Sequence, residues 1–105
     1  MAQALAPTAA GVSISGRVLD ATGRGIALAR LSLTDSSGNT RTALSNPFGY
    51  YSFEDVEVGQ HYVLSIGHKR YVFDPSVRVI NVVDEILDLD FIASPAREAK
   101  PLITT

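Results

Sequence analysis

Apolar and polar residues alternate with a period of two along most of this chain. In residues 12–19, Val12, Ile14 and Val18 fall on one face, and mostly polar residues fall on the other. Because successive side chains of a β-strand point to opposite faces, this pattern predicts a strand buried on one side. Similar alternation predicts further strands at residues 27–35, 40–44, 50–53, 62–66, 76–83 and 86–92. No long stretch has the helical period of 3.6 residues.

The alternation also predicts which side chains face the core. The residues expected to point inward from the second, fourth and last strands are Ala27, Ala29, Leu31, Leu33, Tyr51, Phe53, Leu87, Leu89 and Phe91. Two more apolar residues, Val56 and Val58, lie in the connection after the fourth strand, and we expect both to fold back onto the core.

Turn residues separate these segments at intervals of about 8 to 12 residues. Asp, Gly, Asn and Ser dominate at residues 20–25 and 35–39, and Asn46-Pro47-Phe48-Gly49 combines a fixed φ at Pro with a flexible Gly. About seven short strands with this spacing predict an all-β fold, a single antiparallel β-sandwich with Greek-key connections.

Composition limits the chain to one domain with two flanking arms. The chain has 105 residues, of which 46% are hydrophobic and 19% charged, so it can bury one core. Proline interrupts both ends, and we expect a flexible arm at residues 1–11, a folded domain at 12–93 and a second arm at 94–105. The last four residues are rich in β-formers, which suggests an assembly arm that adds to a neighbour's sheet: Leu102, Ile103, Thr104 and Thr105.

Charge and cysteine content exclude several classes of partner. The net charge is −2 and the nine basic residues are scattered, so we expect no nucleic-acid binding. No apolar run reaches the length of a membrane helix, so we expect no membrane insertion. Without cysteine there is no disulfide or thiolate metal site. Ala2-Gln3-Ala4 has the small-x-small form of a signal-peptidase site, which favours a secreted or cell-surface bacterial protein.

The polar residues do not form a recognisable catalytic or metal-binding pattern. His61 and His68 flank one strand and lack further ligands nearby in sequence, and the acidic run at residues 84–90 lacks the glycine-centred spacing of a calcium loop. No serine lies in a G-x-S-x-G elbow. We therefore expect no catalytic residues, no metal and no cofactor, and hence no enzyme activity.

Aromatic and basic residues that point outward are the candidate partner-binding groups. These residues lie at the Pro-Gly turn and in the segment after the fifth strand: Phe48, Tyr50, Lys69, Arg70 and Tyr71. Exposed aromatic side chains can anchor a protein or stack on a sugar ring. The alternative is that they only cap the end of the sandwich.

Three blocks of the sequence together resemble the carboxypeptidase regulatory-like domain, a transthyretin-like (prealbumin-like) β-sandwich. The matching residues are Gly16, Val18, Asp20, Gly23, Ile26, Ala29, Leu31, Gly49, Tyr51, Phe53, Val56, Val58, Gly59, Tyr62, Leu89 and Phe91. The resemblance implies the fold and an accessory, structural or binding role, because the matching positions are turn glycines and inward apolar residues. Related Cna-B-type domains often carry an isopeptide from a first-strand lysine. Here that strand offers Arg17, which stays protonated, so we expect no cross-link.

These observations favour a non-catalytic, secreted or cell-surface module with a structural, spacing or protein-binding role. Its partner is then a protein, either a second copy or another surface protein. Two alternatives stay open at this point, a self-assembling subunit of an extracellular fibre or surface layer that uses its terminal arms, and a carbohydrate-binding module.

Overall fold

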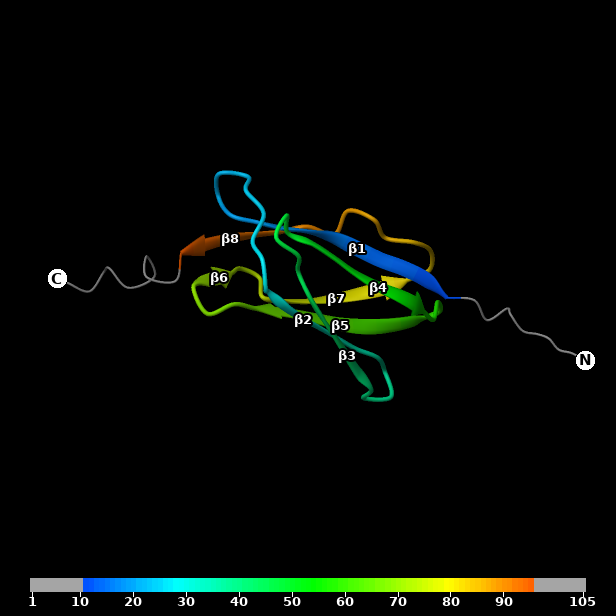
Figure 1. The fold of residues 1–105 in the computed structure, drawn as a ribbon. Coiled ribbons are helices and arrows are strands. Elements are labelled where there is room, and N and C mark those ends of the chain that lie inside the picture. The colour runs from blue at the N-terminus through cyan, green and yellow to red at the C-terminus, as the bar shows by residue number, and fades with distance from the viewer. Residues whose placement is uncertain (1–10, 96–105) are drawn as a thin grey trace, which may run out of the picture.

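The computed structural model describes residues 11–95, which form a β-sandwich (Figure 1). Its eight strands are β1 (Val12–Leu19), β2 (Arg30–Thr34), β3 (Thr40–Leu44), β4 (Tyr50–Val56), β5 (Gln60–Gly67), β6 (Tyr71–Phe73), β7 (Val77–Val82) and β8 (Phe91–Pro95). One sheet has the order β4-β1-β8-β6 and the other β3-β2-β5-β7. The all-β sandwich is therefore confirmed, with β6 as an additional strand.

One strand pair departs from the antiparallel arrangement. Val18 pairs with Phe91 and Leu19 with Ile92 in parallel register, so β8 runs in the same direction as β1. As a result β1 begins at one end of the sandwich and β8 finishes at the other (Figure 1). β8 also pairs with β6 up to Pro95, two residues into the segment expected to be an arm. The predicted assembly arm, Leu102 to Thr105, lies outside the described residues.

The strand predicted at residues 86–92 is only partly correct. Residues 87–90 form no strand, and Ile86 makes a single bridge to Ile14 before β8 begins at Phe91. The backbone of this segment bonds instead to β1, where Leu89 N donates to Ser15 O at 3.0 Å. Gly16 permits this contact, because a Cβ there would collide with the Leu89 carbonyl. Leu87 consequently points to solvent with 61% exposure, contrary to the prediction.

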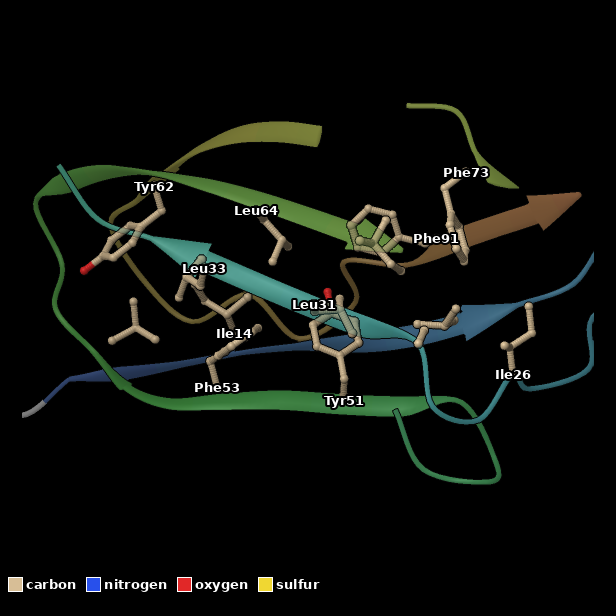
Figure 2. Close-up of a cluster of buried hydrophobic side chains, with 14 of the residues drawn as sticks. Ile14, Ile26, Leu31, Leu33, Tyr51, Phe53, Tyr62, Leu64, Phe73 and Phe91 are labelled. Atoms are coloured by element: carbon tan, nitrogen blue, oxygen red, sulfur yellow. The ribbon is translucent and has the colours of Figure 1, made fainter. Parts of the chain in front are cut away.

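Apolar side chains of both sheets meet between the layers (Figure 2). The Tyr51 ring lies 6.2 Å from Phe53 and 6.3 Å from Phe91 between centroids, and Phe73 meets Phe91 edge to face at 6.4 Å. Most inward positions predicted for β1, β2 and β4 are buried, and so is Val56, whereas Val12 and Ala27, also predicted to point inward, are only partly buried. Val58 is 43% exposed, contrary to the prediction, because it lies in the turn that Gly59 closes with a φ of 92°.

The second strand starts later than the alternation predicted. Residues 27–28 form a turn, Leu28 has a φ of 63°, and β2 begins at Arg30. Leu28 is therefore 67% exposed, next to the outer face of the β3-β2-β5-β7 sheet.

Candidate functional site

The aromatic side chains between the two sheets are almost completely closed to solvent. Tyr51, Phe53, Tyr62 and Phe91 have at most 6% of their surface exposed. The Tyr51 hydroxyl donates to Leu89 O at 2.6 Å, and the Tyr62 hydroxyl donates to Glu57 O at 2.7 Å. Burial raises the pKa of both phenols, so they act as neutral hydrogen-bond donors. The core rings therefore serve the fold.

Most of the carboxylates that accept hydrogen bonds stabilise turns and strand edges. Asp20 accepts from the backbone of Thr22 and Arg24, and Asp35 accepts from the backbone of Ser37 and Asn39. The hydrogen bond from the Thr22 hydroxyl lowers the pKa of Asp20, and the backbone bond from Asn39 lowers that of Asp35. Asp90, part of the acidic run, accepts from Arg17 N at 2.8 Å. Within residues 11–95 no three His, Asp or Glu side chains gather as a metal site would require.

The two histidines have different surroundings. His61 is exposed on the outer face of β5. His68 is half-buried in the loop between β5 and β6, where its Nε2 lies 3.0 Å from Ala27 O and its Nδ1 accepts from Arg70 N at 3.0 Å. The neutral ring with its proton on Nε2 satisfies both bonds. His68 thus ties its loop to the turn before β2.

The structure divides the five predicted partner-binding residues into two groups. Phe48 lies in the turn between β3 and β4, and Tyr50 is the first residue of β4. The Arg17 guanidinium lies 4.6 Å from the Tyr50 ring centroid and donates to Phe48 O at 2.8 Å. Lys69 and Arg70 are exposed on the loop between β5 and β6, and Tyr71 follows at the start of β6. Tyr50 lines a shallow groove of about 350 Å³ with Ser15 and Ser52, whereas the second group lines grooves that contain several cations.

Two adjoining open grooves share Leu28, His68 and Lys69. One, of about 630 Å³, lies over the outer face of β2 and β5, and the other, of about 460 Å³, lies between the turn at residues 25–28 and the loop at residues 68–71. We call them together the basic groove. Ser32, Ser65 and Gly67 form its floor. Its flanks carry two apolar side chains, Leu28 and Leu44, and three cations, Arg30, Lys69 and Arg70. The described residues that line it include no carboxylate.

Buried polar contacts hold the flank of the groove in place. Ser45 is 2% exposed, and its hydroxyl donates to Ile26 O at 2.6 Å and accepts from Ala29 N at 2.9 Å. Ser45 also exchanges backbone hydrogen bonds with Leu28 and Ala29. On the other side, His68 contacts Ala27 O and meets the Tyr71 ring edge to face at 5.2 Å. The groove is thus preformed, and its chemistry suits an anionic ligand with apolar parts.

The sequence pointed to Lys69, Arg70 and Tyr71 but not to Leu28, Arg30 or Leu44. A signal was present, because Leu44 occupies an outward position of its strand, where alternation otherwise places polar residues. The sequence did not show that Leu44 and the turn at residues 27–28 lie beside the loop at residues 68–70, which follows them by about 25 and 40 residues.

Among residues 11–95 no helix is long and apolar enough to cross a membrane.

Comparisons with known proteins support the fold and identify the family. No curated protein matches the chain. Among solved structures, the Bacillus anthracis TIE protein superimposes with a TM-score of 0.69 at 17% identity, covering 82% of this chain and 17% of that one. A C-terminal fragment of the pilus adhesin SpaC from Lactobacillus rhamnosus GG gives 0.67 at 16% identity, covering 80% of this chain and 45% of the fragment.

This chain thus spans less than half of either neighbour, and at these identities the likeness shows the fold alone. The family model of the carboxypeptidase regulatory-like domain matches residues 13–91. That range includes every residue on which the resemblance was based. The chain belongs to the carboxypeptidase regulatory-like domain family.

Proposed function

We propose that this domain is a non-catalytic structural module of a secreted or cell-surface bacterial protein, which spaces other parts of an assembly and contacts protein partners. The observation that carries the proposal is the parallel pairing of β1 with β8. Because β8 continues in the direction of β1, the path from Val12 to Pro95 covers ten residue steps, about 33 Å. Because the chain enters the domain at one end and leaves at the other, the domain adds its own length between the segments that it connects.

The use of polar side chains supports a role without catalysis. Asp20, Asp35 and Ser45 are engaged in local hydrogen bonds, and the rings between the sheets are closed to solvent. One of the structural neighbours is described as a pilus adhesin, which is consistent with a place in an extracellular assembly.

The carbohydrate-binding alternative has less support. A sugar-binding platform needs open aromatic faces, and Arg17 already covers one face of Tyr50. Phe48, which is 67% exposed, then remains as the ring at this turn that Arg17 does not cover. We therefore favour protein partners.

Single-molecule force spectroscopy on a tandem array of the full chain tests the spacing role. Pulling from opposite ends loads the β1–β8 hydrogen bonds in shear, so we expect each domain to resist force and to unfold in one step. Extension of residues 12–95 releases about 270 Å, at about 3.6 Å per residue less the folded span. Unfolding without a resolvable force peak, or in several small steps, would contradict the proposal.

A further inference from the structure

The basic groove has a complementary surface elsewhere on the same chain. The loop after β7 presents three exposed carboxylates, Asp84, Glu85 and Asp88. Two exposed apolar side chains accompany them, Val83 at 72% and Leu87 at 61%. We call residues 83–88 the acidic loop. Its mixture of negative and apolar groups matches the positive and apolar groups of the basic groove, Arg30, Lys69 and Arg70 with Leu28 and Leu44.

We infer that the basic groove receives the acidic loop of a second copy of this chain, so that copies associate head to tail. This inference deepens the proposed function, since it names a partner for the same module. Each docked pair covers exposed leucine and valine side chains and brings carboxylates to unlike charges, which supplies both an apolar contact and electrostatic complementarity.

The acidic loop is held rigidly enough to act as a docking element. Ile86, at its centre, is partly buried against the core and forms backbone hydrogen bonds to β1 in both directions, Ser15 N to Ile86 O at 2.7 Å and Ile86 N to Ser13 O at 3.0 Å. The neighbouring side chains therefore project from a fixed backbone, and little ordering remains to be done on binding.

Distance prevents the two surfaces from meeting within one molecule. The acidic loop follows Val82, which pairs with Gln60 at the start of β5, whereas the groove lies against Gly67 and His68 at the end of that strand. The length of β5 separates them by about 24 Å. Figure 1 shows the loop after β7 and the turn between β5 and β6 toward opposite ends of the sandwich. Surfaces placed in this way form a heterologous contact, which extends into an open chain of copies unless the rotation closes a ring.

The chain's own last segment is a poorer match for the groove. β8 ends at Pro95, which pairs with Tyr71 at the groove, so residues 96–105 are the other occupant to consider. Its sequence, however, contains Arg97 and Lys100 against Glu98. Charge complementarity therefore favours the acidic loop of another copy.

Analytical ultracentrifugation of the full chain over a range of concentrations tests the inference. We expect association at low salt that weakens about tenfold or more at 0.5 M NaCl, because screening shortens the range of exposed charge pairs to about 4 Å. Two double variants should each be monomeric at low salt, Lys69→Glu with Arg70→Glu in the groove, and Glu85→Lys with Asp88→Lys in the loop. Arg24→Glu and Glu57→Lys, which reverse charges outside both surfaces, should associate like the unmodified chain.

Mixing the two monomeric variants gives the decisive result. Each then offers a groove and a loop that complement those of the other, so the mixture should associate again. Continued dissociation of the mixture overturns the inference, as does a wild-type chain that stays monomeric at low salt. If association survives both charge reversals but disappears when residues 96–105 are deleted, the inference is wrong, and the C-terminal arm mediates association instead. The force measurement above is therefore made on a tandem array of the Lys69→Glu, Arg70→Glu variant, in which neighbouring copies should not dock, so the spacing role stands or falls separately.

Discussion

Ser45 gives the most direct test of how the groove is held, because it is a buried polar side chain with two defined partners. Replacement by alanine removes the bond to Ile26 O and the bond from Ala29 N, and leaves a carbonyl and an N–H without those partners. A buried polar group that loses its partner costs about 1–3 kcal/mol. The lost oxygen leaves almost no cavity, so desolvation dominates. We expect Ser45→Ala to lower the free energy of unfolding by about 2–6 kcal/mol, the sum of the costs for the two groups.

Urea unfolding at neutral pH, followed by tyrosine fluorescence in this tryptophan-free chain, measures the change. Ser52→Ala is the matched control, because Ser52 is exposed and bonds to the Glu54 carboxylate at 3.0 Å. We expect the control to change the free energy of unfolding by less than about 0.5 kcal/mol. If Ser45→Ala shifts the urea midpoint as little as Ser52→Ala does, the Ser45 hydroxyl does not stabilise the turn at residues 27–28. The account of a preformed groove is then refuted.

Two further predictions concern the path after β7 and the turns. Gly16→Ala should destabilise the domain by about 3 kcal/mol or more, because the added Cβ collides with the Leu89 carbonyl. Gly67→Ala is the control, because a Cβ at that position has no atom within 4 Å. Equal melting temperatures for the two variants would contradict this prediction. The pKa values of Asp20 and Asp35 are lowered by hydrogen bonds in the folded state, so their contribution to stability is present above about pH 4, the unfolded value, and is lost as pH falls through the folded pKa. Urea midpoints should therefore decline below about pH 4, and the decline should be shallower in Asp20→Asn with Asp35→Asn; an unchanged profile would show that these carboxylates do not contribute.

The groove shows how much of a site the sequence can indicate. Lys69 and Arg70 stand out as adjacent cations between two apolar runs, and they do line the groove. Leu28 was hidden by a misleading local pattern. The alternation predicted that the second strand starts at residue 27. In the structure the chain turns there, and Leu28 has a left-handed backbone conformation. Ser45 forms hydrogen bonds to the backbone of residues 26–29 that a strand at this position would not allow.

Strand β7 shows a second kind of limit. Its residues alternate as predicted, but periodicity is symmetric and does not say which face turns inward. The structure exposes Val77 at 52% and Val79 at 69%, and turns Arg78 toward the core, where its guanidinium lies 4.4 Å from the Phe91 ring centroid and donates to Asp90 O. Arg78 is tolerated at this inward position because its guanidinium contacts both an aromatic face and a carbonyl oxygen at the edge of the sheets. Hydropathy alone would have turned the valines of β7 inward.

The sequence by itself determined most of the strands, most turns and most of the inward positions of β1, β2 and β4, since side-chain alternation and turn chemistry act over a few residues. Only the tertiary structure decided the parallel pairing of β1 with β8, the irregular path of residues 87–90, and the placement of basic and acidic surfaces toward opposite ends. Those features depend on contacts between residues some forty to eighty positions apart, such as Gly16 with Leu89 and His68 with Ala27. No local pattern records such contacts, because each partner satisfies its own local rules equally well without the other.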